Sequence, residues 1–334
     1  MTRIYLTYDN RAHTDGAGAQ LYRIYGIYCL ARKLGFGYLH SPLWRLDHQG
    51  LEAMKTQRPD SSLVARFNSL CTIPSDEPWP SGAKTIDLPD PRPGFHECLL
   101  NEYHNSDEAL IVKITHPHVV LDADPDAWVA AETVSPFNML EDWTGQRPLR
   151  IAVHVRRGDI HILEKNRILP NEYYIGVMRN VQSTFRSLRI PHIIELHSET
   201  TSANFTVRTN DFGTYNMESD VEFHPEVDAF DDFKSIDQLQ YRFNDEPLDA
   251  FCRIATADVI VTSISCFSYL AAMLNPKAVT IYHPFFHSPR SNWIVAAPDG
   301  SFCDKQLCKR FQAPNTSWRG WWDRLRATLP TGRG

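Results

Sequence analysis

The feature that most constrains the fold of this sequence is the alternation of short apolar strands with helices in both halves. In the first half, a strand predicted at 3–8 leads through a glycine-rich turn into a helix at 19–34 that stops at Gly35. In the second half, strands alternate with helices, the strands predicted at 151–155, 192–196, 258–262 and 278–282 and the helices at 172–186, 247–256 and 266–274. Such alternation is typical of parallel sheets covered by helices. We therefore predict an α/β fold with two parallel-sheet domains that face a cleft.

Polar, turn-like residues at 144–148 separate the two halves, so we place the domains at 1–147 and 148–334. We expect Asn171 to cap the helix at 172–186. Residues 199–245 are polar and poorly periodic, which predicts loops, and an aromatic amphipathic helix at 317–329 is expected to return to the first domain. The remaining predicted elements are a strand near Tyr38, helices at 50–55, 62–70 and 125–131, a proline-rich loop at 74–93, and strands at 109–114 and 119–121.

Charge and composition narrow the class of protein. The chain has 334 residues and a net charge of −6, which argues against nucleic acid as the main partner. It contains no apolar run long enough for a membrane span and no signal-peptide core near its first residue, so we expect a cytoplasmic protein without a membrane anchor. Seven scattered cysteines fit a reducing compartment, although Cys303 and Cys308 are spaced closely enough to pair or to bind a metal.

The most informative stretch, IAVHVRRGDIHILEKNRILP, spans 151–170. A buried strand that includes His154 runs into a loop that carries Arg156, Arg157 and Asp159. Ligands of open α/β sheets bind at the carboxyl ends of the strands, and two guanidinium groups there favour a phosphate-bearing ligand. Two alternatives stay open: one arginine forms a structural ion pair with Asp159, and His154 is an ordinary core histidine.

Two further stretches suit an anionic ligand. DGAGAQL, at 15–21, follows a strand and opens a helix, and Gly16 and Gly18 allow close approach of a ligand, although a tight turn explains them as well. TSISCFSYLAAML, at 262–274, places hydroxyl groups where a strand gives way to a helix. Ser265 would cap this helix, and the free amides of Cys266 and Phe267 would form a phosphate-sized nest, unless the serine is only a cap.

Together these motifs resemble GDP-fucose-dependent fucosyltransferases. HVRRGD resembles the HxRRGD motif of that superfamily, and GAGAQLYRIYGIYCLARKLG and SCFSYLAAML resemble segments of its α1,2-fucosyltransferase branch. LPNEYY and IELHSE resemble two shorter family segments, and all the matches follow the family's order. The chain departs from the branch at Ala19, Tyr269 and Leu270, where the family has an asparagine and two tryptophans.

The resemblance implies a GT-B-like fold of two Rossmann-like domains and an inverting enzyme that uses no metal or other cofactor. Fucose would pass from GDP-fucose to a hydroxyl group of a glycan or glycoconjugate, with the acceptor on the side of the first domain. Arg156 would hold the donor phosphates and act in catalysis, while Arg157 would support the loop. The other donor-binding residues implied by position are Asp159 in the same loop, His154 near the nucleotide, Ser265 and Ser268 near the β-phosphate, and Gly16 and Gly18 across the cleft.

Transfer also requires a catalytic base and a residue that binds the guanine base. Glu164 lies on the arginine loop at the spacing of the catalytic base in core α1,6-fucosyltransferases, and His161 is the competing candidate. Guanine presents the hydrogens of N1 and N2, so an acidic side chain is needed, and Glu226 or Asp228 are the candidates.

One stretch suggests a different enzyme. VVLDADPD places Asp122 and Asp124 in a DxD pattern, which in a metal-dependent glycosyltransferase would bind a divalent cation. The simpler interpretation is that Asp124 caps a helix beginning at Pro125. A protein that binds a nucleotide sugar without turning it over is a further alternative.

Overall fold

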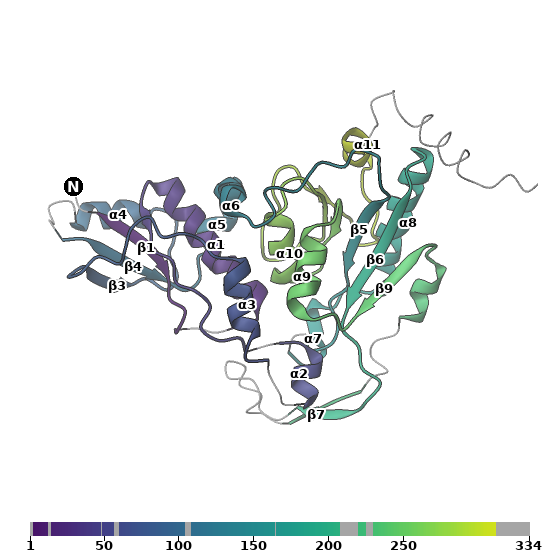
Figure 1. Cartoon of the computed structure of the whole chain (residues 1–334), viewed down its shortest axis with the longest axis horizontal. Helices are drawn as coiled ribbons and strands as arrows, with labels where there is room; N and C mark the ends of the chain where they lie inside the picture. The colour runs from purple at the N-terminus through teal and green to yellow at the C-terminus, as the bar shows by residue number, and fades with distance from the viewer. Residues whose placement is uncertain are drawn as a thin grey trace, which may run out of the picture.

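The protein is described by a computed structural model that covers residues 3–12, 15–47, 49–56, 60–103, 108–163, 165–207, 220–224 and 230–311. Two parallel sheets lie at opposite ends of the molecule, with helices between them (Figure 1). The first sheet has the order β2-β1-β4-β3 and the second the order β12-β11-β10-β5-β6-β9. Every pairing within these two sheets is parallel, so the predicted α/β class with two Rossmann-like, GT-B-like domains is confirmed.

The first domain is built around a central pair of strands and a long helix. Its strands are β1 (Ile4–Tyr8), β2 (Gly37–Tyr38), β3 (Lys84–Asp87) and β4 (Leu110–Ile114). Its helices are α1 (Ala17–Leu34), α2 (Leu51–Thr56), α3 (Leu63–Leu70), α4 (Phe95–Tyr103), α5 (His118–Asp122), the 3₁₀ helix η1 (Pro125–Trp128) and α6 (Val129–Val134). Helix α1 ends as predicted at Gly35, whose φ of 68° is in the left-handed region that glycine adopts without strain.

The second domain holds the larger sheet. Its strands are β5 (Leu149–His154), β6 (His192–Ser198), β9 (Leu239–Phe243), β10 (Val259–Val261), β11 (Val279–Tyr282) and β12 (Ile294–Val295), with β7 (Phe205–Val207) and β8 (Val221–Phe223) forming a separate antiparallel pair. Its helices are α7 (Ile160–Leu163), α8 (Asn171–Ser187), α9 (Pro247–Ala255), α10 (Cys266–Met273), α11 (Lys305–Phe311) and the 3₁₀ helices η2 (Lys165–Arg167) and η4 (Asp231–Ser235). The predicted boundary at 147 lies between the last strand of the first sheet and β5.

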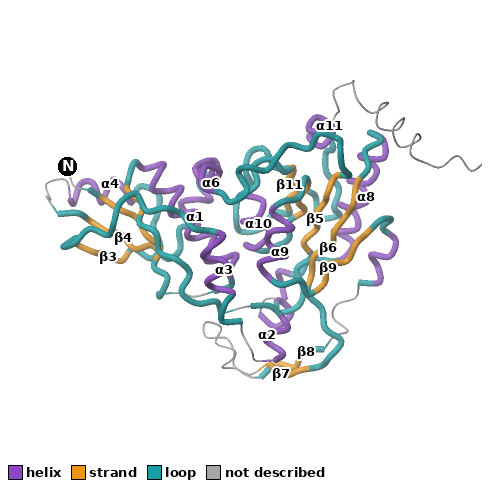
Figure 2. Tube along the Cα trace, viewed as in Figure 1, coloured by secondary structure: helices purple, strands orange, loops and turns teal. Residues whose placement is uncertain are grey.

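Side chains of the second sheet alternate between two apolar cores. Ala152 and Ile260 belong to the core that contains α9 and α10, whereas Ile151 and Val153 belong to the core that contains α8. This alternation follows from the two-residue period of a strand and requires both faces to be covered. Because the first core continues into α1 and α3, helices α1, α3, α9 and α10 form the layer between the two sheets (Figure 2).

Three predicted elements were wrong. The stretch at 119–121, predicted as a strand, belongs to helix α5, and Leu121 packs against α1 where Gly26 leaves room for it. A short apolar run does not by itself distinguish a strand from a buried helix. The predicted loop at 74–93 contains the exposed edge strand β3, and the predicted loops at 199–245 contain β9, whose side chains are exposed or half-buried. An edge strand with little burial shows no strong apolar pattern.

The helix cap predicted at Asn171 was also wrong. Pro170 holds the cap position of α8, and Asn171 is its first helical residue. The Asn171 side chain instead accepts a hydrogen bond from Arg157 and donates one to Asp232. The C-terminal helix predicted at 317–329 lies outside the described residues.

Candidate active site

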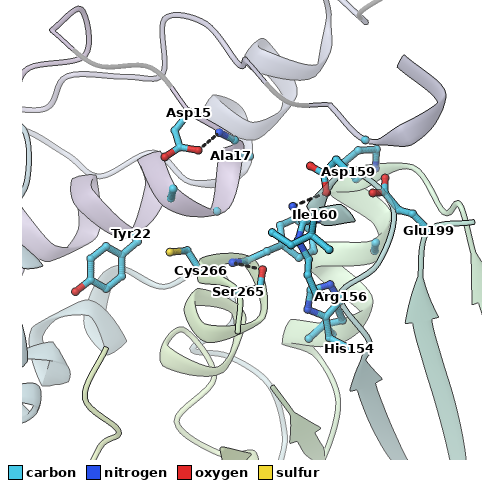
Figure 3. A pocket seen from close by; sticks show the side chains of 18 of the residues that line it. Asp15, Ala17, Tyr22, His154, Arg156, Asp159, Ile160, Glu199, Ser265 and Cys266 are labelled. Carbon is cyan, nitrogen blue, oxygen red and sulfur yellow. Dashed lines mark hydrogen bonds and ion pairs between the residues drawn. The ribbon is translucent and has the colours of Figure 1, made fainter. Parts of the chain in front are cut away.

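A pocket of about 340 Å³ lies between the two domains. The first domain contributes the loop around Gly16 and the start of α1, and the second contributes the carboxyl ends of β5 and β6 and the start of α10. Figure 3 shows Asp15, Ala17 and Tyr22 on one side and Arg156 with Glu199 on the other. The stretches that were singled out from the sequence therefore line one cavity, although they are far apart along the chain.

His154 ends the central strand β5 and is 8% exposed. Its Nδ1 atom lies 3.0 Å from the Ser263 hydroxyl, and its ring lies 5.8 Å from the Phe267 ring. Burial, with the nearby charges of Arg156 and His197, lowers the pKa of His154 to about 3. The imidazole is therefore neutral at physiological pH and can both donate and accept a hydrogen bond at the pocket wall.

Arg156 forms an ion pair with Asp159, with 2.6 Å between Nη2 and Oδ1. The structure thus contains the pair that was weighed as the structural alternative. The two side chains are 21% and 3% exposed, and both residues line the pocket. The loop between them turns at Gly158, whose φ of 71° favours glycine. This pairing fixes the Arg156 guanidinium at the cavity wall, where it can meet an anion.

Arg157 has a different role in the same loop. Its guanidinium donates to the carbonyl oxygens of Arg156 and Leu169 at 2.9 Å and to the Asn171 side chain at 2.6 Å. It also lies over the Tyr174 ring at 5.9 Å. Arg157 is 5% exposed and lines the pocket, but these contacts tie it to the segment that leads into α8. It therefore supports the loop that holds Arg156.

The two glycines of the first domain differ in environment. Gly16 occupies the cap position of α1, and its amide donates to Asp15 at 2.7 Å. Gly18 lies against helix α10, where a Cβ atom would stand 2.5 Å from the Cα atom of Phe267. Both residues line the pocket, yet Gly18 is required by the contact between helices of the two domains.

At the start of α10 the predicted cap is confirmed, because the Ser265 hydroxyl accepts from the Phe267 amide at 3.3 Å. The amide that was expected to be free for a ligand is therefore already bonded within the helix. Cys266 lines the pocket beside Ser265. Ser268 is fully buried outside the pocket lining and accepts from the Ser263 amide at 3.2 Å.

The structure adds pocket residues to which the sequence analysis assigned no role. Glu199 follows β6, lies against the Gly158 turn, and accepts a hydrogen bond from the Leu51 amide of the first domain at 3.0 Å. Its position at the carboxyl end of the strand beside β5 was a usable signal, because parallel neighbours end at the same edge. The other additions are Arg167 from the stretch at 151–170, His197 from the same IELHSE stretch as Glu199, and Arg242 and His287 from two further segments.

His197 is paired with His154 across β5 and β6 and is 2% exposed. Neither of its ring nitrogens has a hydrogen-bond partner among the described residues, although Nε2 lies 3.9 Å from Glu195. Buried polar groups normally have partners, and the His197 ring at the pocket wall interacts with Glu195 and, with Arg150, lowers the pKa of that carboxyl to about 2.

Three predicted site residues lie outside the described residues: the candidate base Glu164 and the guanine candidates Glu226 and Asp228. Their roles stay predictions. His161, the competing base, is described and buried at 7% exposure in α7.

The two carboxylates of the DxD pattern have separate partners. Asp122 accepts from the Ser288 amide at 3.2 Å and lies 3.4 Å from Nδ1 of His287. Asp124 precedes Pro125 at the start of η1 and forms an ion pair with Lys33, without a side-chain cap hydrogen bond. Across the described ranges, no three His, Cys, Asp or Glu side chains converge as a metal-binding group. The two aspartates therefore do not share one ligand position.

Within the described part of the chain, no helix is long and apolar enough to cross a membrane. Neither a protein-family model nor a curated protein matches the sequence. Among solved structures, the chain is similar to POFUT1 in complex with GDP, at 10% identity and a TM-score of 0.43, over 84% of this chain and 97% of that chain. It is also similar to the apo form of POFUT1, at 10% identity and a TM-score of 0.41, over 80% and 94% of the two chains. A third similar structure is E. coli heptosyltransferase WaaC with ADP-2-deoxy-2-fluoro heptose, at 11% identity and a TM-score of 0.35, over 92% and 96%.

Proposed function

We propose that this chain is a GT-B-type glycosyltransferase that transfers fucose from GDP-fucose to a hydroxyl group of a glycan or glycoconjugate. The observation that carries the proposal is the meeting of three fucosyltransferase-like stretches at one pocket. The loop at Gly16, the HVRRGD loop at 154–159 and the start of α10 at Ser265 line the same cavity. Each stretch has a local structural explanation, but their convergence between two parallel-sheet domains supports a common ligand.

The donor diphosphate would bind against Arg156. Breaking the bond between the sugar and the β-phosphate leaves negative charge on the departing GDP, and a fixed guanidinium at the pocket wall stabilises that charge. Asp159 holds the guanidinium in place, and Arg157 holds the loop. The first turn of α10 adds the positive end of a helix dipole beside Cys266. These groups provide a phosphate site that needs no metal ion.

Glu164 would act as the base in this mechanism. The acceptor oxygen attacks the anomeric carbon, its proton passes to the Glu164 carboxylate, and GDP leaves with the electron pair of the broken bond. A single displacement inverts the anomeric centre. The neutral imidazole of His154 would hydrogen-bond the donor nucleotide, and Glu226 or Asp228 would accept from N1 and N2 of guanine.

A donor screen with a product readout tests the proposal. The protein is incubated with GDP-fucose, GDP-mannose or uridine diphosphate sugars and a set of glycan acceptors, and released nucleotide and product mass are measured. We expect GDP release that depends on GDP-fucose and acceptor, with a product heavier by one fucose. Tight GDP binding with no turnover on any acceptor would instead identify a nucleotide-sugar-binding protein. Turnover with uridine diphosphate sugars alone would refute the proposed donor.

A further inference from the structure

Cys266 and His287 line the pocket, and Asp122 lies behind His287, on the other nitrogen of its ring. The Sγ atom of Cys266 is 3.4 Å from Nε2 of His287, and Nδ1 of the same ring is 3.4 Å from Oδ1 of Asp122. The three residues come from the start of α10, the segment after β11 and the end of α5. This is the order of a thiol, an imidazole and an orienting carboxylate in a nucleophilic cysteine site.

The surrounding structure fixes the geometry of this cluster. The imidazole packs against the rings of Tyr22 and Tyr269, with ring centroids at 4.2 Å and 5.0 Å, and the two tyrosine rings also contact each other at 5.9 Å. The Ser288 amide donates to the same Asp122 oxygen at 3.2 Å, which orients the carboxylate toward the ring. His287 is 3% exposed, so water does not compete strongly for its nitrogens. The imidazole thus has one preferred position.

The His287 imidazole faces the Cys266 sulfur and carries a positive charge. Burial lowers the pKa of His287, but the charges of Cys266 and Asp122 and its hydrogen bonds to them raise it to about 9. The ring is therefore an imidazolium at neutral pH, facing the sulfur. Cys266 is also the first residue of α10, where the helix dipole favours an anion. Other charged or titratable groups that act on the cluster include Tyr22 and Arg23 of α1, His118 of α5, Tyr269 of α10 and Tyr282 of β11.

Three of the other cysteines provide a contrast. Cys29 and Cys71 are buried thiols in the first domain, and burial raises the pKa of each to about 12. Cys98 is exposed on α4. Cys266 alone among these four lines the pocket, and its side chain points toward α1 and Tyr22 in Figure 3. A small reagent that enters the pocket can therefore meet its sulfur.

We propose that Cys266, His287 and Asp122 form a nucleophilic thiolate site that undergoes exchange with small disulfides inside the cleft. The thiolate sulfur of Cys266 attacks one sulfur of the disulfide, a new S–S bond forms, and the old S–S bond breaks. The second sulfur leaves with the electron pair as a thiolate, so no further oxidant is required. The imidazolium stabilises the attacking thiolate, and Asp122 stabilises the imidazolium. The adduct occupies the pocket.

The pH profile of alkylation tests this proposal independently of any transferase activity. The protein is treated with iodoacetamide between about pH 6 and pH 8, and peptide mass spectrometry follows Cys266 and, as an internal reference, the exposed Cys98. Below its pKa of about 8.5, an ordinary thiol is alkylated roughly tenfold faster for each unit by which the pH rises. We expect this rise at Cys98 and a nearly flat rate at Cys266. Limited access of iodoacetamide to the pocket lowers the alkylation rate of Cys266 by the same factor at every pH, so it does not change the shape of the pH profile.

Two variants and one reagent complete the test. His287→Gln should make the Cys266 profile rise in parallel with that of Cys98, and Asp122→Asn should shift it in the same direction. Oxidised glutathione at neutral pH should transfer one glutathionyl group to Cys266, with glutathione thiolate leaving, before it modifies Cys98. A wild-type Cys266 profile parallel to that of Cys98 would overturn the proposal. So would an unchanged flat profile in His287→Gln, or modification of Cys98 alone by glutathione. If the variants do not fold, the pH profile of Cys266 alkylation in the wild type tests the proposal by itself.

Discussion

Gly18 of α1 lies directly against the backbone of Phe267 in α10. A Cβ atom at Gly18 would stand 2.5 Å from the Cα atom and 2.6 Å from the N atom of Phe267, and neither backbone atom can move without displacing the helix. This contact sets the spacing between the two domains beside the pocket. Gly18→Ala should lower the free energy of unfolding by about 1–3 kcal/mol, as overpacking of a close contact does. Urea-induced unfolding measures this change.

Gly26 in the same helix is the matched control. A Cβ atom there would meet the end of the flexible Leu121 side chain at 2.3 Å, which can rotate away. Because alanine also favours a helix by roughly 1 kcal/mol over glycine, Gly26→Ala should change the stability little. Equal effects of the two substitutions would contradict the close contact between α1 and α10.

The buried imidazole of His154 should make the stability depend on pH. Its pKa is about 3 in the folded protein and 6.5 without the fold, so the unfolded chain binds the extra proton. The contribution of the neutral His154 imidazole to the free energy of unfolding is complete above pH 6.5 and is lost as the pH falls toward 3. Between about pH 7 and pH 5 the wild type should lose about 2 kcal/mol more than His154→Asn. Urea unfolding at both pH values provides the comparison, and parallel losses would refute the assignment.

How far the sequence predicts the fold depends on burial. Strand β5 and helix α10 are buried and strongly patterned, and they were predicted within two residues. Strands β3 and β9 lie at sheet edges with exposed side chains, so their sequences resemble loops. Helix α5 was mistaken for a strand because its apolar run is only one turn long, and its packing against Gly26 is not visible in the sequence.

The site was predictable only where a motif is local. Arg156 and Asp159 are three residues apart, so their ion pair could be weighed from the sequence. Glu199 ends the quoted stretch IELHSE, but no role was assigned to it, and His287 lies in no quoted stretch; only the fold brings them beside Arg156 and Cys266. The nest predicted from the amides of Cys266 and Phe267 loses one of its two donors, because the serine that caps the helix accepts from the Phe267 amide, although both residues line the pocket.

Glu164 carries the chemical step in the proposed mechanism. Glu164→Gln keeps the shape of the side chain but removes the proton acceptor, so turnover of GDP-fucose should fall by on the order of 10²-fold or more. GDP binding should stay at the wild-type level. Glu172→Gln, an exposed change in the first turn of α8, is the control and should leave turnover intact. Wild-type turnover in Glu164→Gln would remove Glu164 from the mechanism.

Metal dependence can be tested by chelation. The proposed phosphate site consists of Arg156 and the start of α10, so turnover should persist in excess EDTA. Asp124→Asn should also have little effect, because Asp124 pairs with Lys33 on a partly exposed surface. Loss of turnover in EDTA that is restored by a divalent cation would favour the metal-dependent alternative instead.

The central claim is that Arg156 binds the donor diphosphate in the cleft, and calorimetric titration with GDP tests it most directly. Arg156→Ala should weaken GDP binding by on the order of 10²-fold, the scale of a lost electrostatic donor. Arg156→Lys keeps a charge beside the buried Asp159 and controls for folding, as does thermal unfolding of each variant. The control is Arg186→Ala. Arg186 lies on the surface of α8 and pairs with Asp237, so this variant should bind GDP like the wild type. Selective loss of GDP binding in Arg156→Ala is the predicted result, whereas wild-type affinity in a folded Arg156→Ala protein would contradict the account.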